Sequence, residues 1–319
     1  MKVKIAYLVF AYKNPQLLQR AIEALSGEDC EFFIHIDQKS DIKEFSGIEG
    51  RNVFFSEKRL PVYWGEFSGV QAILLLLRQA LERSQNCDYL VLLSGSEYPL
   101  RGREYIHAFL EANRGGEFIS TVKMPNEAAG KPISRINTLR IQSHKPVRRF
   151  AVRALAKLGL AQRDYRKYLG SLEPYAGSTW WALTRDACQY LSEFVERNRH
   201  VEEYFQSVFA PEEAFFHTIL GNSAFHSRTR RNLLYEDWFA RGGHPEMIDE
   251  HHIALFESQQ KVFLDDVFGS GEALFARKFS DDRLDLIQRV DAMILQKDGG
   301  DPRGGMAAFG RPVGHDRSA

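Results

Sequence analysis

The chain has 319 residues, of which 44% are hydrophobic and 26% are charged. These proportions are typical of a globular protein that buries a sizeable core, and the length suits one large α/β domain or two smaller ones. Lys plus Arg and Asp plus Glu are balanced at 42 each, which argues against a dedicated nucleic-acid-binding protein, so we expect no nucleic-acid partner.

The cysteines and the apolar runs indicate a cellular compartment. Cys30, Cys87 and Cys188 are far apart and form no Cys-x-x-Cys pair, which predicts reduced thiols and not a disulfide framework. The first residues lead into a strand-like segment without a hydrophobic signal core. The longest apolar run, residues 72–77, is too short to span a bilayer. We therefore expect a cytoplasmic protein.

Strand and helix patterns alternate through the first hundred residues. Asn14 is the predicted N-cap of the first helix, with Pro15 in its first position. A second helix is predicted over Gly69–Arg83. Apolar, β-rich runs predict strands over Val3–Tyr12, Phe32–Asp37, Asn52–Ser56 and Tyr89–Ser94. This alternation predicts an α/β fold with a doubly wound, mostly parallel sheet flanked by helices, in which ligands bind at the carboxyl ends of the strands.

The rest of the chain is less regular. Residues 122–143 are polar and loop-like, and further helices are predicted over Arg185–Asn198, Pro211–Leu220 and Asp281–Leu295. We expect a single domain over residues 1–297, with two halves that meet near residue 120. Residues 298–319 are rich in glycine and proline without periodicity, which predicts a disordered tail.

Residues 145–167 form a basic segment with interspersed apolar residues. Its basic side chains outnumber the single acid, Asp164. One hypothesis is peripheral contact of an amphipathic helix with an anionic membrane. The alternative is a solvated surface helix.

Polar residues follow two of the predicted strands. Asp37 ends the second strand; it is either part of a solvated turn or an acceptor of hydrogen bonds from a nucleotide. Glu97 follows the fourth strand, in an ordinary turn or in a ligand site. The chain contains no Asp-x-Asp motif, and one carboxylate offers too few ligands for a hard cation. We therefore expect no metal here, so that positive side chains would take its place.

Two further clusters carry charge. Glu212 and Glu213 follow Pro211 at a predicted helix start, where acids favour the helix dipole or where one of them serves as a general base. Arg277 and Lys278 lie between two phenylalanines. They are either solvated or held rigidly to stabilise a leaving diphosphate.

Eight segments spread over residues 4–280 occur in a recognisable order. They read IAYLVFAYKNPQLLQRAI, FFIHIDQKS, VYWGEFSGVQA, LLSGSEYPLR, GSTWWALTR, APEEAFFHTIL, YEDW and FARKF. In this order they resemble the core-2/I-branching β-1,6-N-acetylglucosaminyltransferase family, which includes the peptide O-xylosyltransferases. The resemblance implies a GT-A type sheet and an inverting mechanism that needs no divalent metal.

The resemblance also implies roles at the donor site. Glu213 matches the general base, and Lys278 matches the lysine that contacts the diphosphate of UDP, with Arg277 as its neighbour. Asp37 matches an aspartate near the nucleoside. Arg241 is the nearest candidate for a second arginine that binds the diphosphate.

The acceptor side follows in the same way. Tyr235 and Trp238 lie where the family places aromatic residues that contact the acceptor. Trp180 either stacks on a sugar face or packs in the core. Glu97, which we also assign to the acceptor side, stands where the family has an aspartate.

We therefore expect an inverting, metal-independent glycosyltransferase that moves N-acetylglucosamine from a UDP-sugar to a hydroxyl of a glycan acceptor. Residues 1–120 would bind the nucleotide, and residues 121–297 would bind the acceptor and carry the base. The UDP-sugar is a substrate, and no cofactor is expected. The alternatives are a xylosyltransferase that uses UDP-xylose and a non-catalytic relative that binds a glycan or a nucleotide.

The stem, cysteines and membrane anchor of the family's Golgi members are absent from this sequence. Their absence predicts a bacterial-type enzyme of polysaccharide biosynthesis, cytoplasmic or peripheral to the inner membrane face. Its acceptor would then be a glycan or a lipid-linked glycan, with the 145–167 segment as the membrane contact.

Overall fold

A computed structural model of the chain describes residues 2–140, 154, 157, 161–238 and 244–299. Its centre is a seven-stranded sheet with the order β3-β2-β1-β4-β7-β6-β8. The first four strands of the chain are parallel neighbours, and they are β1 (Ile5–Ala11), β2 (Cys30–Ile36), β3 (Val53–Phe55) and β4 (Tyr89–Ser94). β1, β3 and β4 lie within the predicted runs, whereas β2 begins at Cys30, two residues before its predicted run. Strands covered on both faces consist mainly of apolar residues, which is why all four could be predicted.

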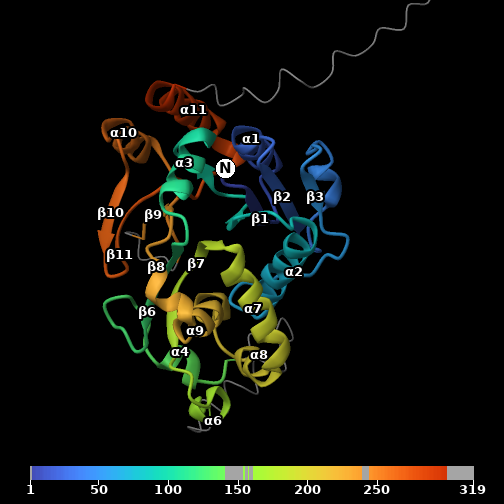
Figure 1. The fold of residues 1–319 in the computed structure, drawn as a ribbon, viewed down its shortest axis with the longest axis vertical. Helices are drawn as coiled ribbons and strands as arrows, with labels where there is room; N and C mark the ends of the chain where they lie inside the picture. The colour runs from blue at the N-terminus through green and yellow to red at the C-terminus, as the bar shows by residue number, and fades with distance from the viewer. Residues whose placement is uncertain (1, 141–153, 155–156, 158–160, 239–243, 300–319) are drawn as a thin grey trace, which may run out of the picture.

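The other half of the sheet comes from the middle of the chain. It consists of β6 (Glu117–Lys123), β7 (Tyr175–Thr184) and β8 (Thr229–Arg230). β7 runs antiparallel to both neighbours, whereas β8 is parallel to β6. The sheet is therefore mixed with a mostly parallel core and helices around it, which confirms the predicted fold class (Figure 1).

The helices of one group pack against the sheet and also against one another. It includes α2 (Ser68–Arg83), α7 (Arg185–Arg197) and α9 (Phe215–Gly221). α3 (Arg103–Ala112) contributes Ile106 and Leu110 to the same main core. The short helices α4 (Ser134–Asn137), α6 (Arg166–Leu169) and α8 (Arg199–Phe205) lie at the end of the molecule away from the amino terminus (Figure 1).

A second, smaller layer covers the carboxyl ends of the parallel strands. Its three-stranded sheet has the order β5-β12-β9 and consists of β5 (Tyr98–Pro99), β12 (Phe275–Arg277) and β9 (Leu234–Glu236). The hairpin of β10 (Phe263–Asp266) and β11 (Gly269–Glu272) and the helices α10 (Glu250–Ser258) and α11 (Leu284–Asp298) complete it. Leu17 and Ala21 of α1 (Pro15–Leu25) join its apolar cluster, so α1 lies between the two cores.

Three expectations differ from the structure. Asn14 precedes α1, but it has a left-handed backbone conformation and its side chain does not cap the helix. Asp281 does so instead, by accepting from the main-chain N–H groups of Gln16 (3.2 Å) and Leu17 (2.8 Å). The predicted helix over Pro211–Leu220 is a 3-10 turn at Pro211–Glu213 followed by α9. The loop-like stretch over 122–143 begins inside β6 and contains α4.

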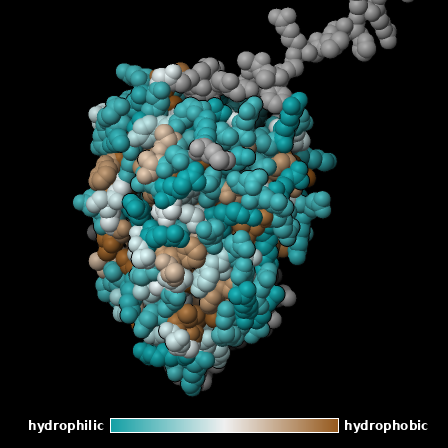
Figure 2. Space-filling view, viewed as in Figure 1, coloured by the Kyte–Doolittle hydropathy of each residue, from teal (hydrophilic) through white to brown (hydrophobic). Residues whose placement is uncertain are grey.

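The predicted membrane contact can be compared with the helices and the surface of the described residues. Among the described residues, no helix is both long and apolar enough to cross a bilayer. Hydrophilic residues cover most of the face seen in Figure 2, and the hydrophobic ones lie in separate groups. Most of the basic 145–167 segment and nearly all of the predicted tail lie outside the described residues.

Candidate active site

Three segments that are distant in sequence meet above the carboxyl ends of β1 and β4. The Asn14 side chain, just after β1, donates to the Ser96 hydroxyl (3.2 Å) and to the Phe279 carbonyl (3.4 Å). The Phe279 N–H in turn donates to the Ser96 carbonyl (2.9 Å). These bonds place the end of β12, with Arg277 and Lys278, at the edge where ligands bind in folds of this type.

Arg277 is held by two acids and an aromatic ring. Its Nε lies 3.1 Å from Oε1 of Glu97, in an ion pair without hydrogen-bond geometry, and its Nη1 lies 3.7 Å from Oε1 of Glu236. The guanidinium carbon is 4.4 Å from the ring centroid of Trp180, a favourable cation–π contact. The charge of Arg277 is therefore fixed in position.

Lys278 differs from Arg277 because it lacks an acidic partner. Its half-buried ammonium makes no ion pair with any of the described residues. Burial lowers the pKa of Lys278, and the positive charges of Arg277 and Lys13 lower it further, against a weaker opposing effect of Glu97 and Glu236. An anion bound at Lys278 would therefore relieve unfavourable electrostatics.

Glu213 lies in a cationic niche. Lys131 Nζ and Arg135 Nη1 both donate to its Oε2 atom, and no hydrogen bond from a described residue reaches Oε1. Burial by itself would raise the pKa of Glu213, but the charges and hydrogen bonds of Lys131 and Arg135 outweigh it and lower this pKa. The carboxylate is thus ionised at neutral pH and fixed by one oxygen.

Two neighbours of Glu213 have pKa values that are shifted in favour of their neutral forms. Burial, together with the charge of Glu213, raises the pKa of Glu212 to about 7, and Oε2 of Glu212 has no hydrogen-bond partner. Burial and the charge of Lys131 lower the pKa of His217 to about 3. Burial also raises the pKa of Glu236, on which the charges of Arg277 and Glu213 both act. Glu236 therefore lies between the two cationic clusters.

The structure brings together most of the predicted site residues, and it adds three. Glu97, Trp180, Arg277 and Lys278 form one cluster, which Glu236 links to Glu213. The residues that the sequence analysis missed are Lys131, Arg135 and Glu236. Lys131 and Arg135 lie in none of the motif segments that were singled out in the sequence, whereas Glu236 lies in the YEDW segment, of which only Tyr235 and Trp238 were assigned a role.

Two residues assigned to the acceptor are differently placed. The Glu97 side chain is fully buried, accepts from the main-chain N–H of Ser94 and pairs with Arg277. Trp180 is 5% exposed, and Phe10 and Arg277 pack against its ring. In this arrangement both position Arg277 and do not offer a surface to a sugar.

Three of the remaining candidates are among the described residues, and none of their side chains makes a hydrogen bond, ion pair or ring contact with this cluster. Trp238 is 54% exposed, whereas the Tyr235 ring packs edge-on against Phe256 in the smaller core. Asp37 follows β2, and its carboxylate accepts from the main-chain N–H (2.9 Å) and the ammonium (2.8 Å) of Lys39. Arg241 lies outside the described residues.

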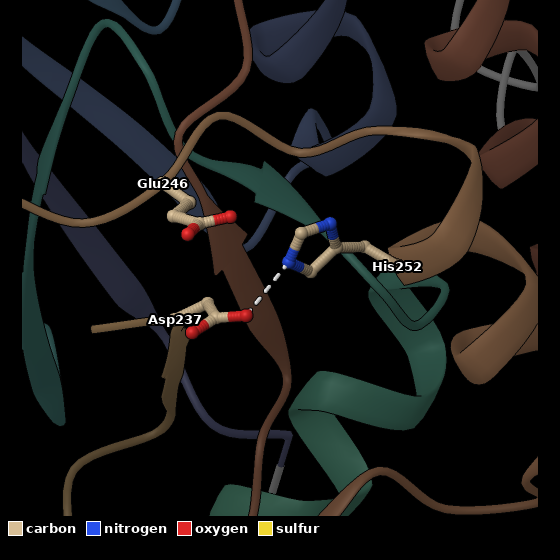
Figure 3. A group of neighbouring side chains, drawn as sticks. All are labelled: Asp237, Glu246 and His252. Carbon is tan, nitrogen blue, oxygen red and sulfur yellow. Dashed lines mark hydrogen bonds and ion pairs between the residues drawn. The ribbon is translucent and has the colours of Figure 1, made fainter. Parts of the chain in front are cut away.

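One group of side chains among the described residues could hold a metal ion. It consists of Asp237, Glu246 and His252, whose ligand atoms all lie within 4.8 Å of one another (Figure 3). None of the three was singled out as a ligand in the sequence. Asp237 directly follows β9, Glu246 precedes α10, and His252 lies in the first turn of α10.

The chain is similar to known glycosyltransferases in sequence. The family model described as Core-2/I-Branching enzyme matches residues 5–260. Xylosyltransferase 2 of Homo sapiens is 27% identical over 292 residues, which are 87% of this chain and 32% of that protein. Xylosyltransferase sqv-6 of Caenorhabditis elegans is 23% identical over 318 residues, 92% of this chain and 36% of that protein. The chain thus spans about a third of the length of these relatives.

Solved structures give a weaker comparison. The 4-diphosphocytidyl-2C-methyl-D-erythritolsynthase from Anaerococcus prevotii DSM 20548 is 13% identical, with a TM-score of 0.29, over 61% of this chain and 74% of that one. A putative glucose-1-phosphate thymidylyltransferase from Bacillus anthracis is 12% identical, with a TM-score of 0.31, over 63% and 83%. Neither score is high enough to support an argument about this chain.

Proposed function

This chain belongs to the Core-2/I-Branching enzyme family, and from that premise we propose that it is an inverting glycosyltransferase that needs no metal for transfer. The donor is a UDP-sugar, with N-acetylglucosamine as the first candidate sugar, and the acceptor is a hydroxyl of a glycan. The names of the curated relatives favour xylose from UDP-xylose as the second candidate.

The observation that carries this proposal is the unpaired ammonium of Lys278 beside the fixed guanidinium of Arg277. Lys278 has no acidic partner of its own among the described residues, and it lies beside the fixed Arg277 at the carboxyl edge of a parallel sheet, so this edge suits a diphosphate. In transfer from a UDP-sugar, negative charge develops on the leaving diphosphate. Cations already fixed in place stabilise that charge without reorganisation.

Glu213 supplies the base in this proposal. Its lowered pKa keeps it ionised, and the cations on Oε2 leave Oε1 to accept a proton. The acceptor oxygen attacks the anomeric carbon and forms a new C–O bond, while the bond from that carbon to the diphosphate oxygen breaks. The hydroxyl proton passes to Glu213, the bonding pair leaves with UDP, and the configuration at the carbon inverts.

We test the diphosphate contact by comparing UDP with uridine in calorimetric titrations. Lys278→Ala is expected to weaken UDP binding about 10- to 100-fold, because a charged hydrogen bond is lost, and to leave uridine binding nearly unchanged. Lys261→Ala is the matched control, since that exposed lysine pairs with Glu272 far from the site. An equal loss for UDP and uridine, or no loss, would contradict the assignment.

The alternative functions, a xylosyltransferase and a non-catalytic relative, are distinguished from the proposed one by the products that form. Release of UDP from UDP-xylose but not from UDP-N-acetylglucosamine would establish the xylosyltransferase. Binding of UDP without turnover on any acceptor would favour the non-catalytic relative. A lipid-linked acceptor, the membrane contact of residues 145–167 and a place in bacterial polysaccharide assembly stay predictions from the sequence.

A further inference from the structure

A buried histidine beyond the end of β9 has carboxylates on both sides of its ring. His252 is 3% exposed. Its Nδ1 atom lies 2.6 Å from Oδ1 of Asp249, and its Nε2 atom lies 3.1 Å from Oδ2 of Asp237. The carboxylate of Glu246 approaches the same point from a third direction, so that three side chains converge (Figure 3).

Both ring nitrogens of His252 face carboxylate oxygens. Nδ1 lies 2.6 Å from Oδ1 of Asp249 and 3.3 Å from the main-chain N of Asp249, so whether it donates or accepts depends on the tautomer. With the hydrogen on Nδ1, the ring donates to Asp249 and the lone pair on Nε2 faces the carboxylate of Asp237, an arrangement that a metal ion between them would satisfy.

The arrangement matches the requirements of a metal ion. Metal-binding histidines characteristically donate their other ring N–H to a carboxylate, which orients the ring; Asp249 is in that position. One imidazole nitrogen and two carboxylate oxygens suit Zn²⁺, which at bond lengths of about 2.1 Å places tetrahedral ligands about 3.4 Å apart. Nε2 of His252 and Oδ2 of Asp237, 3.1 Å apart, are already close to this spacing. Rotation of the half-buried Glu246 side chain would bring its carboxylate to the same distance from both atoms.

We propose that Asp237, Glu246 and His252 bind one Zn²⁺ ion, with Asp249 orienting the histidine and water in the fourth position. The ion is structural and takes no part in sugar transfer.

The site would hold the main chain on two sides of Lys278. Asp237 directly follows β9, which pairs with β12 through Glu236 and Arg277. On the other side, the Lys278 N–H donates to the Glu246 carbonyl (3.3 Å), and the Ile248 N–H donates to the Lys278 carbonyl (2.8 Å). A metal ion that joins Asp237 to Glu246 therefore links the two segments that flank the lysine.

The test is a calorimetric titration of the tag-free, chelator-treated full chain with Zn²⁺. We expect one ion per chain in the wild type and binding at least tenfold weaker in Glu246→Gln and in His252→Ala. His251→Ala is the matched control, because His251 is exposed and adjacent on α10; its Zn²⁺ affinity is expected to be unchanged. Zn²⁺ should also raise the unfolding temperature of the wild type and not that of Glu246→Gln.

Glu246→Gln keeps the proposal testable if His252→Ala fails to fold. His252 takes part in the capping box of α10, whereas the Glu246 side chain does not. Absence of saturable Zn²⁺ binding in the wild type would overturn the proposal. Equal binding by Glu246→Gln, or loss of binding in His251→Ala, would overturn it as well. Because the readout is binding, the result does not depend on the proposed activity.

Discussion

Burial raises the pKa of a glutamate, but the glutamates of the candidate active site differ in their pKa because neighbouring cations oppose burial to different extents. Glu213 has two cations on one oxygen, and its pKa is lowered despite burial. Burial raises the pKa of Glu212 to about 7, and the cations that it shares with Glu213 do not offset this. Adjacent residues of one turn are thus an ionised base and a group that is close to half-protonated at neutral pH.

The raised pKa of Glu212 predicts a pH-dependent cost in stability. From its ordinary value of 4.5 up to about 7, the unfolded chain releases this proton while the folded chain keeps it. Stability therefore falls as pH rises through this window, by about 3 kcal/mol in total. Glu212→Gln is expected to remove the cost, so that its gain over wild type is small near about pH 4.5 and largest above about pH 7.

Urea unfolding at several pH values measures this difference. Glu257→Gln is the control, because Glu257 lies in a surface ion pair with Arg289, and such pairs contribute little. If Glu212→Gln were no more stable relative to wild type above pH 7 than near pH 4.5, the buried carboxyl would not carry this cost.

At the level of elements, the sequence was informative where packing imposes a simple pattern. β1 to β4 are continuous apolar runs, and all four were predicted. β7 is the longest strand of the sheet, but it contains Gly177, Ser178 and Thr179, so its pattern did not predict a strand. The cap of α1 could not be predicted either, because Asp281 is more than 260 residues away from Leu17 along the chain.

The capping contact gives a prediction about α1. Asp281→Ala is expected to cost about 1 kcal/mol of unfolding free energy, because the N–H groups of Gln16 and Leu17 lose their acceptor. Denaturant unfolding measures the loss. Asp285→Ala is the control, since that exposed side chain pairs only with Arg283 and is expected to change stability by less than about 0.5 kcal/mol. Equal effects of the two variants would show that the cap is not what stabilises the helix.

At the level of the whole molecule, the candidate site is assembled from segments that the sequence separates widely. The motifs identified Glu213, Arg277 and Lys278, because these residue types recur in short, ordered segments. Lys131 and Arg135 could not be found in this way, since their positions beside Glu213 depend on how α4 and the segment before it lie against η2 (Pro211–Glu213). Glu236 lies in the YEDW segment, but its position beside Arg277 depends on the pairing of β9 with β12. For the same reason Glu97 and Trp180 could not be recognised from sequence as supports of Arg277.

The central claim is that the cations at the end of β12 and the carboxylate of Glu213 transfer a sugar without a metal ion. The most direct test is UDP release in excess EDTA, with a panel of UDP-sugars and glycan acceptors, by the wild type, Glu213→Gln and Glu246→Gln. We predict EDTA-resistant release with one donor, also in Glu246→Gln, and a loss of about 10²- to 10⁴-fold in Glu213→Gln with nearly unchanged UDP affinity. Release that requires added Mn²⁺ in both the wild type and Glu246→Gln, or full turnover by Glu213→Gln, would contradict the account.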